Sequence, residues 1–160
     1  MRLKTFVNYL IFALLLITQS ACHQGVIFED NVEIPDYRWD TSYQVVITPT
    51  IEDSLMPYHI FINVRNASGY AFSNLFLFLE TTAPSGKTGL DTLEITLADE
   101  TGKWLGDGSG DIWDNRTLFK RNFVFPEAGT YTFKLQQAMR VNPLPQIMDV
   151  GLRIEKASQQ

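Results

Sequence analysis

Hydrophobic residues recur at every second position through much of the chain, and this period is what most constrains its fold. At Tyr131, Phe133 and Leu135, for example, each apolar residue is separated from the next by a polar one. The same alternation runs through residues 92–97 and 148–155. Successive side chains of a β-strand point to opposite faces. The pattern therefore predicts strands that bury one face and expose the other to solvent.

Four further segments have the composition of strands: Tyr43–Thr48, Tyr58–Arg65, Leu75–Glu80 and Leu118–Phe125. Clusters of Gly, Pro, Asn and Asp separate these segments and indicate turns. The run NLFLFLE at 74–80 is apolar on both faces, so we expect it inside a sheet or under a covering loop. Seven or eight short strands with frequent turns predict an all-β chain that forms a single antiparallel β-sandwich, Ig-like or jelly-roll-like.

The first residues of the chain follow a different pattern. Arg2 and Lys4 precede an almost unbroken apolar run over residues 6–17, and two small residues follow at 20–21. This is the layout of a secretory signal peptide, and the run is too short to span a membrane. We therefore predict a signal peptide over residues 1–21.

The predicted cleavage point coincides with the one cysteine of the chain. Ala21 stands directly before Cys22, as in a bacterial lipobox, where the cysteine thiol is acylated and becomes the new N-terminus; Gln19 departs from the apolar residue usual three positions before the cysteine. We predict that Cys22 is lipidated, that residues 22–30 form a tether, and that residues 31–160 form the β-sandwich domain. The alternative is an ordinary secreted protein in which Cys22 is incidental.

The charge of the chain excludes some classes of partner. Loss of residues 1–21 removes two bases and no acid, so 11 basic and 18 acidic residues remain and the formal charge becomes −7 instead of −5. A nucleic-acid-binding protein needs a basic field, so we expect no nucleic-acid partner. Membrane attachment must come from the acyl chains rather than from charge. A single cysteine also excludes an intramolecular disulfide and a thiolate metal site.

No catalytic motif is present in the sequence. His59 lies in a predicted strand, and no local serine or carboxylate motif accompanies it, so we expect a surface or edge histidine. Pairs of acids carry little information in a domain with this many carboxylates. We therefore predict that the protein is not an enzyme and has no cofactor.

The segment 99–114, DETGKWLGDGSGDIWD, is the most unusual part of the chain. An EF-hand loop starting at Asp107 fails, because Ile112 replaces the required glycine and Leu118 replaces the bidentate glutamate. We predict a long connection in which glycines form tight turns and two tryptophans fix the loop to the domain, with no metal site. The alternative is an irregular calcium site with Asp107, Asp111 and Asp114 as weak candidate ligands.

Several aromatic residues lie in or beside predicted loops: Trp39, Tyr70, Phe72, Trp104 and Trp113. Exposed rings on a sandwich can stack on sugars or form the centre of a protein interface, whereas buried rings close the ends of the core. A long ordered loop in a small domain is usually functional. Trp104 and Trp113 are therefore candidate partner-binding residues.

Several motifs then occur in an order that resembles one protein family. They are Y-x-F-S-N-L at 70–75, D-T-L-E-I-x-L-A-D at 91–99, G-K-W-L-G-x-G at 102–108, Q-A-M-R at 137–140 and D-V-G-L-R-I at 149–154. With the cysteine at position 22, they make the chain resemble the gliding motility lipoprotein GldH family over essentially its whole mature length. The G-K-W-L-G-x-G and Q-A-M-R motifs are the most specific parts of this resemblance, and Arg140, in the Q-A-M-R motif, is a weaker partner-binding candidate.

The resemblance implies a lipid-anchored envelope protein of gliding and related Gram-negative bacteria, linked to surface motility and to type IX secretion. It implies no enzymatic activity, cofactor or catalytic residue. We therefore expect a structural or assembly component, in the outer rather than the inner membrane. Its expected partners are the membrane, through the N-terminal lipid, and other envelope proteins of the gliding machinery. A carbohydrate-binding surface lipoprotein is the alternative, and the residues favour sugar binding less.

Overall fold

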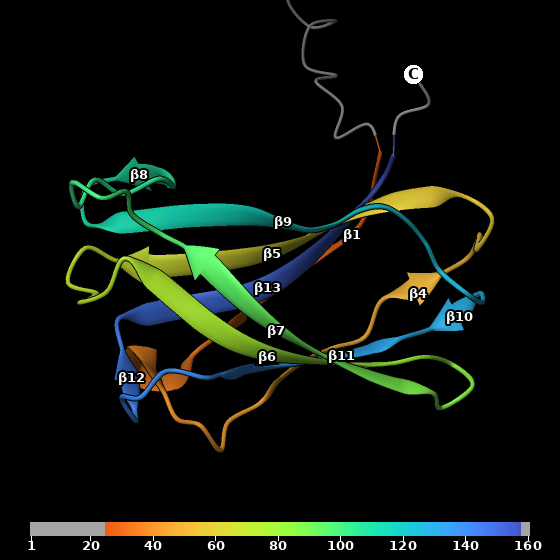
Figure 1. Cartoon of the computed structure of the whole chain (residues 1–160), viewed down its shortest axis with the longest axis horizontal. Helices are drawn as coiled ribbons and strands as arrows, with labels where there is room; N and C mark the ends of the chain where they lie inside the picture. The colour runs from red at the N-terminus through yellow and green to blue at the C-terminus, as the bar shows by residue number, and fades with distance from the viewer. Residues whose placement is uncertain (1–24, 158–160) are drawn as a thin grey trace, which may run out of the picture.

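The computed structural model describes residues 25–157, and in this range the chain forms two antiparallel β-sheets packed face to face (Figure 1). This arrangement confirms the prediction of an all-β sandwich. The predicted signal peptide and Cys22 lie outside the described residues. Within residues 25–157, no helix has the length and apolar character needed to cross a membrane.

The larger sheet has five strands and contains both the first and the last strand of the chain. Its order is β1 (Val26–Glu33), β13 (Ile147–Lys156), β5 (Pro57–Ala67), β9 (Ile112–Val124) and β8 (Asp107–Ser109). Because β1 pairs with β13, the two ends of the described chain leave the sandwich side by side (Figure 1).

The smaller sheet has the order β3 (Val45–Ile47), β11 (Thr132–Gln137), β6 (Asn74–Thr82) and β7 (Thr88–Thr96). Two short pairs complete the strands: β4 (Thr50–Ile51) with β10 (Gly129–Thr130), and β2 (Arg38–Trp39) with β12 (Leu144–Pro145). The connection from β1 to β2 contains a short 3-10 helix, η2 (Pro35–Tyr37). Strand β6, the segment that is apolar on both faces, lies between β11 and β7, as predicted for an interior strand.

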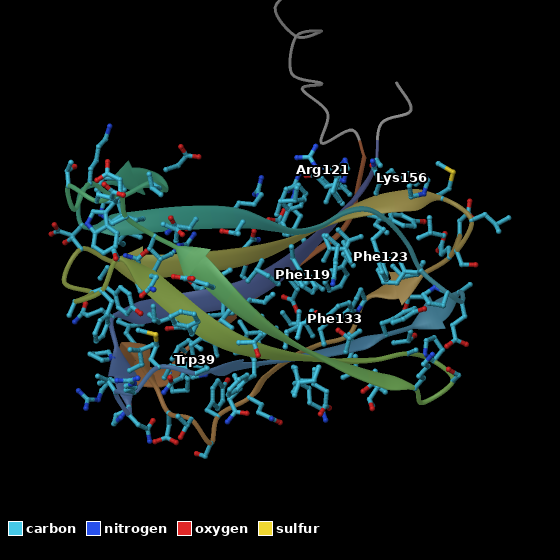
Figure 2. The ribbon with its side chains drawn as sticks, viewed as in Figure 1. Trp39, Phe119, Arg121, Phe123, Phe133 and Lys156 are labelled. Atoms are coloured by element: carbon cyan, nitrogen blue, oxygen red, sulfur yellow. The ribbon has the colours of Figure 1, made fainter. Side chains whose placement is uncertain are left out.

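The core lies between the inner faces of the two sheets and follows the predicted alternation. Tyr131, Phe133 and Leu135 are all buried, whereas Lys134 lies on the opposite face. Figure 2 shows Phe133 in the space between the sheets. Burial of the apolar side chains that meet here is the main favourable contribution to folding.

Residues 26–30, which we expected in the tether, instead form the first part of β1. Glu29 lies on the outer face and pairs with Arg153, but the exposed Asp30 follows it at the position opposite the buried Leu152, so polar residues occupy both faces and hide the alternation. The predicted solvent exposure of one residue on β13 was also wrong. Arg153 was predicted on a solvated face of β13, but it is 7% exposed, because β13 lies between two strands whose side chains cover it.

The segment 99–114 is not wholly a loop, since β8 and the start of β9 form a hairpin within it. Trp113 lies opposite Gly108 in this hairpin, and a Cβ atom at Gly108 would come within 2.2 Å of the Trp113 ring. Only glycine therefore allows the ring to lie there. The glycines in this segment suggested turns, but one of them lies in strand β8, so no alternation of polar and apolar residues marks the strand in the sequence.

The predicted strand Tyr43–Thr48 is shorter than expected, since β3 covers only Val45–Ile47.

The inward register of β11 gives a stability prediction. Phe133→Ala should lower the free energy of unfolding by about 3–5 kcal/mol, because it opens a cavity between the sheets. Lys134→Ala should lower it by less than about 1 kcal/mol, because it removes one half-exposed ion pair with Glu80. Urea denaturation of the two variants measures both values, and equal losses would contradict this register.

Candidate functional site

A polar groove of about 480 Å³ crosses the outer face of the five-stranded sheet. Its floor comes from β1, β13, β5 and β9, and residues 105–107, which lead into β8, form a wall. Side chains at the groove are mainly charged or carry amides: Glu29, Asn31, Asn63, Arg65, Asp107, Asp114, Asn115, Arg116 and Asp149. These residues come from five separate segments of the sequence, so the sheet register alone brings them together.

One row of the groove runs straight across four strands. Asn31 pairs with Gly151, Gly151 with Asn63, and Asn63 with Arg116. A Cβ atom at Gly151 would lie 1.9 Å from Asn31 Oδ1, so the glycine is what lets the Asn31 amide lie flat on the sheet. From there Asn31 Oδ1 accepts a hydrogen bond from Asn63 Nδ2 at 3.1 Å. The side chains of this row, Asn31, Asn63 and Arg116, therefore present polar groups along the groove.

A second row is made of opposite charges centred on Arg65. Its Nε donates to Asp114 Oδ1 at 2.7 Å, and its Nη1 donates to Asp149 Oδ2 at 3.0 Å. The hydrogen bond to Asp114 is the largest cause that raises the pKa of Arg65. The guanidinium group therefore joins β5 to both neighbouring strands and stays charged.

Glu29 is the carboxylate that collects the most donors in the groove. Its Oε1 accepts from Asn63 Nδ2 at 3.0 Å and from Arg116 Nη2 at 3.3 Å, and its Oε2 pairs with the buried Arg153. Burial raises the pKa of Glu29, but the hydrogen bonds from Arg153 and Asn63 outweigh it, and the pKa falls below its ordinary 4.5. Arg153 has a second carboxylate partner, Glu155. Burial opposes the charge of Arg153, yet its hydrogen bonds to Glu155 and Glu29 leave its pKa raised.

Glu29, Arg65 and Arg153, the groups whose pKa is shifted in and beneath the groove, are not suited to proton transfer near neutral pH. A general acid or base needs a pKa near the working pH. The shifts at Glu29, Arg65 and Arg153 instead hold each group in its charged form. Guanidinium and amide donors alternate with carboxylate acceptors in fixed positions, which suits a polar partner with complementary hydrogen bonds.

The three aspartates proposed as weak calcium ligands do not form one cluster. Asp107 and Asp114 pair across the β8–β9 hairpin and both line the groove, but Asp114 is bonded to Arg65. Asp111 accepts a hydrogen bond from Ser68 Oγ at 3.1 Å. In the part of the chain that the structure describes, no group of three or more His, Cys, Asp or Glu residues is arranged to hold a metal ion.

Trp104 and Trp113 are brought together by the fold. Their rings stack with centroids 6.4 Å apart and an interplanar angle of 28°. Both are half-buried, and Trp104 also packs against the core. The Trp113 Nε1–H is buried without an acceptor among the described residues. Trp104 directly precedes the groove wall in the sequence, but Trp113 alternates with Asp114 on β9, so the stacked pair lies on the face of β9 opposite the groove.

The other aromatic and basic candidates lie elsewhere. Trp39 and Tyr70 are buried in the core, where Trp39 Nε1 donates to the carbonyl of Tyr43 at 2.8 Å. Arg140 is exposed in the connection between β11 and β12, apart from the residues that line the groove. His59 lies on the outer face of the interior strand β5, and its Nδ1 accepts the backbone N–H of Asn122 at 3.2 Å.

Comparison with known proteins gives consistent matches over nearly the whole chain. The family model described as GldH lipoprotein matches residues 26–154. The gliding motility lipoprotein GldH homolog of Christiangramia forsetii is 35% identical over 162 residues, covering 97% of this chain and 99% of that protein. The gliding motility lipoprotein GldH of Flavobacterium johnsoniae is 32% identical over 163 residues, covering 98% and 99%.

Among solved structures, the crystal structure of the Yersinia pseudotuberculosis-derived mitogen aligns with 83% of this chain and 89% of its own. The two share 7% sequence identity with a TM-score of 0.33, which is too low to support an inference about function.

The depressed pKa of Glu29 gives a pH-dependent prediction. Glu29→Gln should lower the free energy of unfolding at pH 7 by about 1–3 kcal/mol, because charge-assisted hydrogen bonds to Arg153 and Arg116 are weakened. A carboxylate whose pKa is lower in the folded state stabilises above its unfolded pKa, and this contribution is lost as the pH falls through the folded pKa. The difference between wild type and variant should therefore be full above pH 4.5 and shrink on acidification below it.

Denaturant titrations at a series of pH values measure that difference. Glu94→Gln is the matched control, because Glu94 is a strand carboxylate on the other sheet that accepts from Asn74 Nδ2 rather than from a cation. A difference for Glu29→Gln that stays constant or grows on acidification would show that Glu29 is not stabilised as a charge.

The tryptophan stack gives a third prediction. Trp113→Ala should destabilise the domain by about 2–4 kcal/mol, because it uncovers Gly108 and removes the ring that stacks on Trp104. Trp113→Phe should cost clearly less, since it keeps an aromatic ring and removes a buried N–H that has no acceptor. Thermal and urea unfolding compare the two variants. Equal losses would mean that the indole N–H has a partner that stabilises it.

Proposed function

The chain belongs to the GldH lipoprotein family, and from this premise we propose that it is a non-enzymatic assembly component of the gliding motility and type IX secretion machinery. Membership identifies a lipoprotein linked to gliding motility and held by lipid in the cell envelope. We propose that Cys22 carries the lipid and that the membrane is the outer one. The sandwich then presents its polar groove to another envelope protein.

The observation that carries this proposal is the set of fixed, opposite charges in the groove. Arg65 and Arg116 are each about half exposed although each is paired, so both can still bond to a partner. Paired charges of this kind contribute to specificity and orientation at interfaces more than to raw affinity. A groove of this character supports docking of a polar protein surface in one register.

The charge states support a binding role over an enzymatic one. At Glu29 the hydrogen bonds that lower the pKa come from Arg153 and Asn63, which also fix its position in the sheet. A group that bridges strands in its charged form stabilises the structure only while it stays charged. Proton transfer through it would weaken the sheet that forms the groove.

A sugar-binding role has less support, because the rings that suggested it are already in contact with the protein. Trp39 and Tyr70 lie in the core, and Trp104 and Trp113 stack on each other. Sugar binding on a sandwich needs an exposed ring face. The proposal therefore remains a protein partner.

Trp104, Trp113 and Arg140 remain proposed contributors to partner binding. Trp104 is joined directly to Leu105, the first residue of the groove wall, but the stacked pair lies on the opposite face of β9, so it would take part only if the partner also reaches around the β8–β9 hairpin. Arg140 would take part only if the partner also reaches the β11–β12 connection.

Site-specific photo-crosslinking in intact cells tests the groove as the partner surface. A photoreactive residue at Leu105, which is 57% exposed on the groove wall, should form an adduct with a discrete envelope protein. Val46 is the matched control, because it is 49% exposed on β3 of the other sheet. Immunoblotting and mass spectrometry of the adducts give the result.

Arg116→Gln in the Leu105 background should reduce the adduct severalfold, because it removes one guanidinium from the groove. Lys134→Gln should leave the adduct unchanged, since Lys134 is a similarly exposed cation that is paired with Glu80 on the smaller sheet. Adducts of equal strength at Leu105 and Val46, or an adduct that does not respond to Arg116→Gln, would contradict a partner in the groove.

A further inference from the structure

One end of the five-stranded sheet carries the start of the described chain. The carbonyl of Gly25 accepts the backbone N–H of Lys156 at 2.7 Å, and the carbonyl of Pro57 accepts that of Ala157 at 2.9 Å. Pro57 in turn pairs with Val124, the last residue of β9. These residues form a row across β1, β13, β5 and β9, which we call the Gly25 end.

The Gly25 end lies close to the proposed site of lipid attachment. Cys22 precedes Gly25 by three positions, and three residues span at most about 11 Å even when fully extended. If Cys22 carries the lipid, as the proposed function requires, the Gly25 end is held within that distance of the lipid headgroups. The opposite end of the sheet has no such constraint.

The Gly25 end also has an exposed apolar side chain at its margin. Leu55 is 88% exposed and lies two residues before Pro57 in the connection from β4 to β5. The carboxylate of Asp53 accepts the backbone N–H of Leu55 at 2.9 Å, so the turn that presents Leu55 is ordered. Val124, in the same row as Pro57, is 50% exposed. Apolar side chains in this position gain free energy when they enter the interface of a bilayer.

Two cations lie at the same end. Figure 2 shows Arg121 and Lys156 beside the point where both ends of the described chain leave the sandwich. Both are exposed, and neither forms an ion pair with any residue in 25–157. Asn122, with φ of 51°, lies next to Arg121 at a bulge in the β5–β9 ladder, where the alternation is interrupted and both residues are exposed.

The charge of this end is nonetheless mixed. Glu52 and Asp53, in the same connection as Leu55, are exposed acids that offset the two cations. The Gly25 end is therefore not a basic patch that would attract a membrane from a distance. Its apolar side chains and its cations fit a lipid surface that is already held close by an anchor.

We propose that the Gly25 end rests on the phospholipid surface, with Leu55 inserted among the headgroups and Arg121 and Lys156 on lipid phosphates. The length of β9 from Asp114 to Val124, at roughly 3.3 Å per residue, is about 33 Å. The groove wall beside Asp114 thus lies at the far end of the same strand. In this orientation the lipid leaves the wall and the tryptophan pair free for a partner.

Fluorescence quenching on the acylated, mature protein tests this orientation. Leu55→Cys introduces a single reactive thiol, because the sulfur of an acylated Cys22 is blocked, and Leu55 is exposed enough for the change to be tolerated. The thiol is labelled with an environment-sensitive fluorophore, and the protein is reconstituted into vesicles of phosphatidylethanolamine and phosphatidylglycerol that contain a headgroup spin label. Leu105→Cys, on the groove wall, is the control.

The label at position 55 should shift to the blue and be quenched severalfold more strongly than the label at position 105. Equal quenching at the two positions, or stronger quenching at 105, would overturn the orientation. Arg121→Gln combined with Lys156→Gln should reduce quenching at position 55. If the double variant quenches like the parent, the contact of these cations with lipid phosphates is wrong.

The intact mass of the reconstituted protein separates failure of this inference from failure of the proposed anchor. A protein without lipid on Cys22 would contradict the anchor, and the orientation with it. An acylated protein whose position 55 is not quenched would overturn the orientation alone.

Discussion

Strand β13 lies between β1 and β5, and the rest of the structure depends on these two ladders. Leu152 illustrates the arrangement, since it pairs with Asp30 on one side and with Ile62 on the other. The β1–β13 ladder joins segments near opposite ends of the chain, and the β5–β13 ladder joins β13 to residues 58–66, so their formation must offset a large loss of conformational entropy. Burial of Val150, Leu152 and Ile154, none of which has any solvent exposure, supplies much of the compensating free energy.

The same ladders explain the unusual outer face of the larger sheet. Because β1 covers β13, Glu29 is placed against Arg153, and a side chain that would otherwise be solvated becomes a buried cation. Burying a charge is costly unless it is paired and hydrogen-bonded. Glu29 and Glu155 meet this requirement, and Asn63 and Arg116 extend the network to the next two strands. The ion pairs that stabilise the sheet and the polar groove therefore depend on the same pairing of β1 with β13. Substitutions of Glu29 or Arg153 will alter both.

The proposed anchor and the wall of the proposed partner groove lie at different ends of one sheet. A lipid on Cys22 would hold the end at Gly25 near the membrane, and β9 leads from there to the groove wall at residues 105–107. A rigid sandwich between the two ends would keep a partner at a fixed height above the membrane. For an assembly component this geometry is useful, because it limits the orientations in which two envelope proteins can meet.

The sequence by itself determined the all-β class, the inward positions of β11 and the family, because alternation and motif order are local patterns. The sequence also contains the polar pairs Asn63 with Arg65, and Asp114 with Arg116, but only the first pair falls in a predicted strand, because residues 99–114 were predicted as a long connection. It did not show that these pairs face each other, since register depends on which strands become neighbours and a shift of one residue moves every side chain to the other face. The strand character of 26–30 was hidden for a related reason: Glu29 is stabilised there by Arg153, 124 residues away in the sequence. Only the tertiary structure decided where the groove lies, because charges such as Glu29, Arg65 and Arg116 are held in place by partners that the chain brings from distant segments.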